Sequence, residues 1–226
     1  PHHDLHASAI EVGQHFRQAD PRLPGLIAAR MVDLLKWADV IREAFLEGKT
    51  SLEVQTDPGK CTLGQWLAGS EARKAYAGAD ADLKTAWDQM LVAHRRLHES
   101  AVDICRHIGE GDQGMATARQ VFAERTAPLL HETLGHMEQM KTSADQAVAG
   151  MTKASEVFVT KTKPCLEQVQ SLLGQATDQV TEVVDQTNSE MTASAGSTKM
   201  SVSILCVVAV VIGVFAAILI GRGIVR

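Results

Sequence analysis

The stretch DLKTAWDQMLVAHRRLHESAVDICRHI, residues 82–108, decides the fold because its apolar residues recur at alternating steps of three and four. This spacing places side chains along one face of an α-helix. We therefore predict a helix from about Asp82 to Ile108 with one buried face. The predicted face consists of Leu83, Trp87, Met90, His94, Leu97, Ala101, Ile104 and Ile108.

The remaining sequence before residue 200 also predicts helices. A long helix is expected after Pro24 and ends near Glu47, because Gly48 is a typical C-terminal residue. A shorter helix over about His3–Gln18 precedes it, and a last helical region begins near Met115 after a glycine-rich turn. We expect an all-α fold, an antiparallel helical bundle of the four-helix type. The long helix has a second apolar stripe, formed by Ile27, Met31, Leu34, Ala38, Ile41 and Phe45.

The last helical region contains an internal repeat. Residues 121–130 align with residues 157–166, an offset of 36 positions, and match in Val, Phe, Thr, Pro and Leu. Pro128 and Pro164 each remove a backbone donor and should kink a helix or begin a new one. Three-four spacing then persists from Val169 to Thr187, which is typical of a stalk helix that packs against a partner.

Two histidines and a cysteine form a candidate metal site. His94 lies on the apolar stripe, where an imidazole without a partner would cost roughly 1–3 kcal/mol. His98 is one helical turn further on, so both rings can bind one ion. Cys61 would add a soft thiolate, a combination that suits Zn(II). The alternative is that His94, His98 and Cys61 are core residues bonded to neighbouring groups.

The surroundings of Cys61 predict its reactivity. Asp57 followed by Pro58 is typical of a helix start, which would place Cys61 in the first turn of a short helix. The positive end of that helix, together with Lys60, should lower the pKa of the thiol and favour the thiolate. The other interpretation is a small buried residue at a helix start.

The pattern Cys61-x-x-Gly64-x-Trp66, followed by His94-x-x-x-His98 and preceded by a helix carrying a Trp, resembles the chemoreceptor zinc-binding domain. The resemblance implies a zinc held by one Cys and three His. The first of these His lies three residues before the Trp of the opening helix.

In this chain that Trp is Trp37, and Leu34 stands where the first-helix His is expected. Asp33 could bend toward the ion, which gives Cys61, His94, His98 and Asp33 as the candidate zinc ligands. An open fourth position, filled by water or by a mobile His, and a complete loss of metal are the alternatives.

One segment predicts a transmembrane helix. Ser201–Ile220, SVSILCVVAVVIGVFAAILI, carries no charge over the length needed to cross a hydrocarbon core of about 30 Å. Arg222 and Arg226 follow it and Lys199 closely precedes it, so the positive-inside rule places the C-terminus in the cytoplasm. We therefore expect an inner (cytoplasmic) membrane protein with residues 1–200 extracytoplasmic, in the periplasm.

Composition excludes some classes of function. The formal net charge of −5 and the absence of a concentrated basic face argue against nucleic acid as a partner. The chain has no His-Glu-x-x-His motif, phosphate-binding loop or nucleophile elbow, so we do not expect an enzyme. Its four Cys are widely separated, unlike those of a disulfide-stapled module.

The larger part of the chain resembles the extracytoplasmic sensing region of bacterial methyl-accepting chemotaxis proteins. This resemblance is carried by His-Glu-Ser-Ala starting at His98, by the Thr-x-Pro-x-Leu repeats and by the arginine-bearing exit from the membrane. It implies five parts: an N-terminal helical segment (1–22), a zinc-domain-like bundle (23–110), a membrane-proximal region (111–200), the membrane helix (201–220) and the start of a cytoplasmic linker of the HAMP type (221–226).

The function implied is the signal-sensing module of a transmembrane chemotaxis receptor that senses metal or redox state through a Cys/His zinc site. The expected partners are a second copy of the chain, the membrane and a metal or small-molecule stimulus, with the cytoplasmic signalling domain outside this sequence. The alternative is a metal-free helical-bundle sensor that binds a small organic ligand or a partner protein.

Overall fold

The computed structural model describes residues 2–224 of the chain, and their backbone contains helices and no strand. The predicted all-α fold is confirmed. Residues 225 and 226, the end of the predicted HAMP-type segment, lie outside the described residues. In chain order the helices are α1 (His2–His15), α2 (Leu23–Glu47), α3 (Thr62–Ala68), α4 (Ser70–Gly78), α5 (Ala81–Ile108), α6 (Gly111–Val121), the π-helical η1 (Phe122–Thr126), α7 (Ala127–Val157), the π-helical η2 (Phe158–Thr162) and α8 (Lys163–Ile224).

Helix α5 is the helix predicted from the apolar pattern of residues 82–108. It starts after Asp80, whose carboxylate accepts a hydrogen bond of 2.9 Å from the backbone N–H of Leu83 and so satisfies one free donor of the first turn. All eight residues of the predicted face are buried, none more than 5% exposed. The helical period therefore fixed both the length of α5 and the side that faces the core.

Helix α2 ends where the sequence predicted. Gly48 adopts the left-handed conformation, with φ of 62°, and its backbone N–H donates to the carbonyl oxygen of Ala44. The predicted stripe faces inward: Ile27, Leu34, Ala38 and Ile41 are each at most 2% exposed. The last helical region begins earlier than Met115, because Gly111, with φ of 75°, allows α6 to start after a very short turn.

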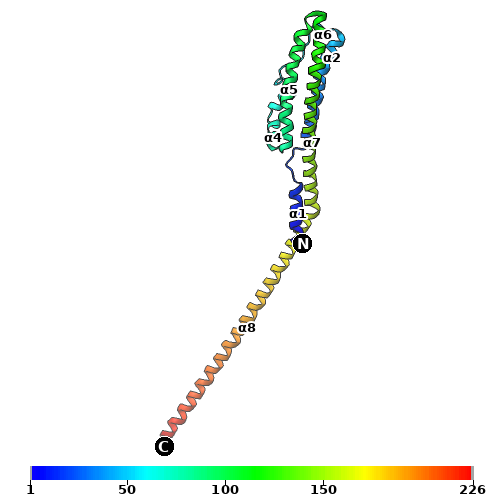
Figure 1. Ribbon diagram of the computed structural model, residues 1–226. Coiled ribbons are helices and arrows are strands. Elements are labelled where there is room, and N and C mark those ends of the chain that lie inside the picture. The colour runs from blue at the N-terminus through cyan, green and yellow to red at the C-terminus, as the bar shows by residue number, and fades with distance from the viewer. Residues whose placement is uncertain (1, 225–226) are drawn as a thin grey trace. The chain divides into compact units, whose positions relative to one another are not determined.

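Residues 5–162 form one compact unit in which α7 runs antiparallel to α5 (Figure 1). Side-chain contacts between the two helical runs establish this direction. As the residue number rises along α5, the residue number of the contacting partner falls. Helix α2 packs against α7 as well, and the short helices α3 and α4 lie against α2 and α5. Helices α6 and α7 thus belong to the same compact unit as α2 and α5. The pairs are Asp80, the N-cap of α5, with Ser143 of α7, Arg96 of α5 with Glu132 of α7, and Ser100 and Asp103 of α5 with Thr126 and Arg125 of η1 respectively.

The two copies of the sequence repeat both form a π-helical turn. In η1 the backbone N–H of Ala127 donates to the carbonyl oxygen of Phe122, five residues back, just before Pro128. The wider turn separates the proline ring from the carbonyl oxygen four residues before it, where a regular α-helix would clash. η2 precedes Pro164 in the same way. The prolines therefore widen a continuous helical run instead of starting new helices.

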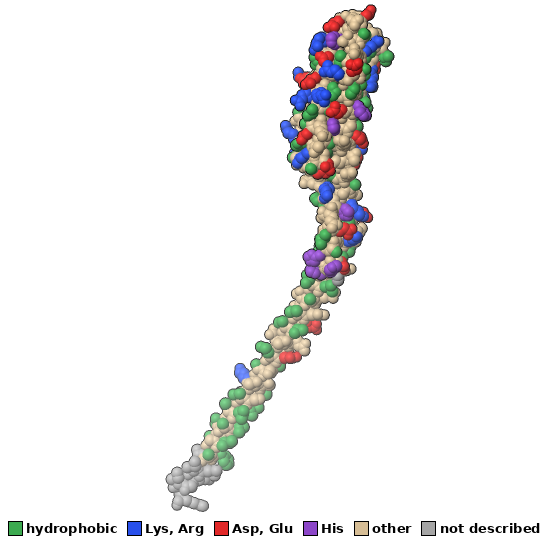
Figure 2. All heavy atoms as spheres, in the orientation of Figure 1, with side chains coloured by type: hydrophobic (Ala, Val, Ile, Leu, Met, Phe, Trp, Pro, Cys, Tyr) green, Lys and Arg blue, Asp and Glu red, His purple; other side chains and the backbone are tan. Residues whose placement is uncertain are grey.

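Of the described residues, 2–4 and 163–224 belong to the second unit. Within the described residues, one helical run is long and apolar enough to cross a membrane, judged by length and composition alone. This run ends in α8. Its apolar side chains are exposed, for example Leu205 at 68% and Val210 at 65%. In Figure 2, positively and negatively charged side chains are scattered over the visible face of residues 5–162, whereas hydrophobic side chains dominate the later part of α8.

Candidate metal centre

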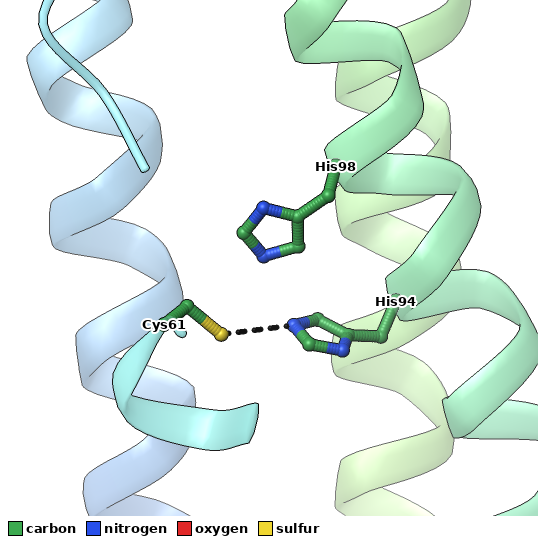
Figure 3. Close-up of side chains that lie close together, drawn as sticks. All are labelled: Cys61, His94 and His98. Atoms are coloured by element: carbon green, nitrogen blue, oxygen red, sulfur yellow. Dashed lines mark hydrogen bonds between the residues drawn. The ribbon is translucent and has the colours of Figure 1, made fainter. Parts of the chain in front are cut away.

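The structure brings Cys61, His94 and His98 together. Their ligand atoms all lie within 4.8 Å of one another, although 33 residues separate Cys61 from His94 in the chain. The closest pair is the sulfur of Cys61 and Nε2 of His94, 3.3 Å apart (Figure 3). His94 and His98 project from successive turns of α5, and Cys61 immediately precedes α3.

His98 is oriented by a backbone carbonyl. Its Nδ1 lies 3.0 Å from the carbonyl oxygen of Gln55, and because this oxygen only accepts, Nδ1 carries the proton and donates it. The same oxygen accepts a hydrogen bond of 2.8 Å from the indole Nε1 of Trp37, whose ring lies 5.0 Å from that of His98. In this neutral tautomer Nε2 of His98 has its lone pair free, as a metal ligand requires.

Nε2 of His98 is a buried polar atom without a hydrogen-bond partner among the described residues. Figure 3 shows this lower ring nitrogen directed toward Cys61 and His94. The residue is fully buried, and leaving such an atom unpaired costs about 1–3 kcal/mol. A metal ion would provide the missing partner.

Both imidazoles are held neutral. Burial lowers the pKa of His94 to about 4, with a smaller contribution from the nearby His98. Burial also lowers the pKa of His98, against the effects of the Gln55 carbonyl and of Asp57. At neutral pH both rings are therefore in the form that binds a metal.

Cys61 is the N-cap of α3, one position before the first turn in which the sequence placed it. The chain turns at Asp57, whose carbonyl oxygen accepts from the backbone N–H of Cys61, and α3 begins only at Thr62. The sulfur accepts a hydrogen bond of 3.2 Å from the backbone N–H of Gly64. The thiol therefore takes the capping role that Ser, Thr or Asp usually fills.

The expected lowering of the Cys61 pKa is wrong. Burial raises the pKa of the thiol, and this effect exceeds the lowering by the N–H groups of Gly64 and Leu63. Lys60 provides little compensation, since its side chain is 74% exposed and its ammonium lies 3.4 Å from the carboxylate of Asp57. Without metal, Cys61 is a protonated thiol at neutral pH, and metal binding would release its proton.

Gly64 explains one element of the sequence motif. A Cβ at this position would overlap the carbonyl oxygen of Pro58, because the start of α3 packs directly on the preceding turn. This close approach is what brings the N–H of Gly64 to the sulfur of Cys61. Two residues later, Trp66 stacks on Trp87 of α5 with ring centroids 5.3 Å apart, which fixes α3 against α5.

Leu34 and Asp33 occupy the side of the site that α2 provides. Leu34 is 2% exposed and belongs to the core. Asp33 is not among the residues whose ligand atoms converge, and its carboxylate lies 3.1 Å from Nε of Arg30 as an ion pair. A cavity of about 170 Å³ lies beside Cys61 and is lined by Asp33, Leu34, Trp37, Gln55, Lys60, Cys61, Thr62 and Leu63.

The donor set fits zinc. One sulfur and two imidazole nitrogens are ligands that Zn²⁺ prefers, and tetrahedral coordination places such atoms about 3.3–3.6 Å apart. The Cys61–His94 separation of 3.3 Å lies in this range, and a pair as far apart as 4.8 Å would have to close by about 1.2–1.5 Å to reach it. The hydrogen bond between His98 and the Gln55 carbonyl could not be predicted from the sequence, because any residue type offers the same backbone oxygen.

Comparison with known families identifies a domain at this site. Residues 35–105 match the family model of the chemoreceptor zinc-binding domain, and the match includes Cys61, His94 and His98 and begins directly after Leu34. Searches among curated proteins and among solved structures returned no match. Residues 35–105 are therefore similar to the chemoreceptor zinc-binding domain, as the sequence motifs indicated.

Proposed function

We propose that this chain is the zinc-binding sensor region of a transmembrane chemotaxis receptor. The observation that carries the proposal is the convergence of Cys61, His94 and His98 with the unpartnered Nε2 of His98. The family match over residues 35–105 supports a role in chemotaxis signalling.

When bound, zinc would supply a Lewis-acid centre that holds a thiolate and two imidazoles together. The protein residues do the positioning. The carbonyl oxygen of Gln55 orients His98, the N–H of Gly64 orients the sulfur, and burial keeps both imidazoles neutral. Because Cys61 precedes α3 while both His lie on α5, the site links the loop before α3 to the central helix of the bundle.

The packing of α5 against α7 supports a route for the signal. Thr126, in the turn before α7, is bonded to Ser100 of α5 at 2.9 Å, and both residues are fully buried. The chain continues from α7 through η2 into α8. A stimulus that changes the position of α5 would favour one of two packing arrangements of these helices, provided it binds the two states with different affinity.

Zinc content tests the proposal directly. The full chain, purified in detergent and treated with excess zinc followed by desalting, should retain one zinc per chain. Cys61→Ala, His94→Ala and His98→Ala should each lose it, whereas His131→Ala, at an exposed position of α7, should not. A wild-type chain that retains no more zinc than the three site variants would refute the zinc site.

Membrane orientation is the second part of the proposal. The charge bias of Arg222 and Arg226 against Lys199 supports a cytoplasmic C-terminus and residues 1–200 in the periplasm. Alkaline phosphatase, which is active only outside the cytoplasm, should be active when fused after residue 198 and inactive when fused after residue 226. The reverse pattern would place the zinc domain in the cytoplasm.

We propose a homodimer as the working assembly. Leu172, Val180 and Val183 of α8 follow the helical spacing of the stalk and are each more than half exposed. A second copy would bury such a stripe. Analytical ultracentrifugation of the full chain in detergent should give twice the mass of one chain. The double variant Val180→Glu, Val183→Glu should give the mass of a single chain.

A metal-free sensor for a small organic ligand has support from a different region. A cavity of about 620 Å³ lies between the segment after α1 and helices α4, α5 and α7, a size that suits a small molecule. Its lining combines cationic Arg17 and Lys74 with anionic Glu71 and Asp80. This candidate predicts a ligand that raises the melting temperature of the full chain equally with and without zinc, and less in the Arg17→Gln variant.

A further inference from the structure

The three converging donors leave one position of a tetrahedral zinc unfilled. Structural zinc sites use four protein ligands, whereas sites with three protein ligands hold a water or another small molecule in the fourth position. Among the described residues, the group that converges consists of Cys61, His94 and His98 alone.

The neighbouring side chains of α2 do not supply a ready ligand. Leu34 has no donor atom, and Oδ2 of Asp33 lies 3.1 Å from Nε of Arg30 in an ion pair whose geometry makes no hydrogen bond. To bind the metal, the Asp33 carboxylate would have to leave this partly buried ion pair, in which the two side chains are 29% and 24% exposed. Breaking a partly buried pair leaves Arg30 without its partner, which is unfavourable.

A cavity lies beside Cys61, on the side of the site that α2 provides. Its volume of about 170 Å³ has room for a molecule of a few atoms. Leu34 and Cys61 both line it, so it adjoins the sulfur on the side where the family's first-helix His is expected. The apolar Leu63 and Trp37 form part of its wall, and the polar Thr62 and Lys60 form another part.

Charge indicates the chemical class of the ligand. A zinc ion held by one thiolate and two neutral imidazoles has a net charge of +1, and a buried net charge is unfavourable. A small monoanion in the fourth position would make the site neutral. Zinc binds nitrogen and sulfur donors well, so the ligand class is a monoanion of a few atoms with such a donor.

We propose that a small nitrogen- or sulfur-donor monoanion enters the cavity beside Cys61 and completes the coordination of the metal, so that the chain senses metal-binding anions. This inference rests on the zinc site proposed above. The replacement of the expected His by Leu34 is what makes the position available.

Cobalt substitution provides a test with a spectroscopic readout. The full chain in detergent is loaded with Co²⁺, and its visible absorption bands are followed during titration with azide and with thiocyanate. We expect a saturable change in these bands. Perchlorate at the same ionic strength, an anion that coordinates metals poorly, should cause no change.

Three variants distinguish the explanations. Leu34→His supplies the missing ligand and should abolish the azide response while strengthening cobalt binding. Leu35→His places the same residue on the outer face of α2, where Leu35 is 42% exposed, and should leave the azide response unchanged. Thr62→Trp should obstruct the cavity and weaken the azide response about tenfold or more, which corresponds to about 1.4 kcal/mol.

The outcomes separate this inference from the proposed zinc site. A chain that binds cobalt but does not respond to either anion would overturn the inference and leave the zinc site standing. An azide response that appears only in Asp33→Asn would also overturn it, because Asp33 would then be the fourth ligand. A chain that binds no cobalt would overturn the zinc site itself. Circular dichroism confirms that each variant is folded before its spectrum is interpreted.

Discussion

His98 donates a hydrogen bond of 3.0 Å from Nδ1 to the carbonyl oxygen of Gln55, and this contact directs Nε2 of the same ring toward Cys61 and His94. Trp37 donates to the same oxygen, so an indole on α2 and an imidazole on α5 hold the loop between them. The metal-binding tautomer of His98 therefore depends on a loop that contributes only a backbone atom.

Trp37→Phe should weaken zinc binding without removing a ligand. The variant keeps an aromatic ring beside His98 and removes the N–H that fixes the Gln55 carbonyl. Loss of such an outer hydrogen bond typically costs about 10–100-fold in metal affinity. Competition with a chromophoric chelator measures the change, and Lys36→Ala, at an exposed position of the same helix, serves as the control. Equal affinities in Trp37→Phe and in the wild type would show that the hydrogen bond has no role in metal binding.

Gly64→Ala should destabilise the domain by about 2–4 kcal/mol, because the added methyl group meets the backbone carbonyl of Pro58 and cannot be accommodated by a side-chain rotation. Gly135→Ala, in the middle of α7 with open space around its Cα, should instead be neutral or stabilising by up to about 1 kcal/mol. Urea unfolding followed by tryptophan fluorescence compares the two. If Gly64→Ala lowers the free energy of unfolding only slightly, the turn before α3 can move away from the added methyl group.

The metal-free chain should lose stability as the pH falls from about 6.5 to about 4. In the unfolded chain His94 titrates near 6.5, whereas in the folded chain burial lowers its pKa to about 4. Between these values the unfolded state binds more protons, so the free energy of unfolding decreases by up to about 1.4 kcal/mol per pH unit. His98, whose pKa is also lowered, adds a contribution of the same sign.

Urea unfolding in the presence of a chelator, at several pH values between 7 and 5, measures this slope. The double variant His94→Asn, His98→Asn should show a shallower slope, and His131→Asn should keep the slope of the wild type. A wild-type slope as shallow as that of the double variant would contradict the burial of two neutral imidazoles.

Thr126→Val should uncouple α5 from the turn before α7. The variant keeps the shape of the side chain and removes the hydrogen bond of 2.9 Å to Ser100, whose hydroxyl still donates to the carbonyl oxygen of Leu97 at 2.7 Å. Because Ser100 keeps one partner, the loss should be that of a single buried hydrogen bond, about 0.5–1.5 kcal/mol. Thr117→Val, whose hydroxyl is exposed on α6, should cost less than about 0.5 kcal/mol in the same unfolding measurement.

The helices could be predicted from the sequence because their burial pattern is periodic. The buried faces of α2 and α5 and the αL residue Gly48 follow from spacing and residue type alone. The convergence of Cys61 with the two His could be predicted only through the motif, since the contact spans a loop whose path depends on tertiary packing.

The pKa of the Cys61 thiol could not be predicted from the local sequence. Its residue type and its neighbour Lys60 favour a thiolate, yet burial dominates and raises the pKa of the thiol. Desolvation depends on which helices cover the sulfur, and no local pattern reports this. The role of α7 was missed for a similar reason, because a continuous apolar stripe predicts a buried helix without identifying the helices that bury it.

X-ray absorption spectroscopy at the zinc edge tests the central claim most directly. For the zinc-loaded full chain, the account predicts one sulfur ligand at about 2.3 Å and two imidazole nitrogens at about 2.0–2.1 Å, with the sulfur contribution lost in Cys61→Ser. A zinc environment of oxygen and nitrogen alone in the wild type would contradict it, because Cys61 would then have no part in holding the metal.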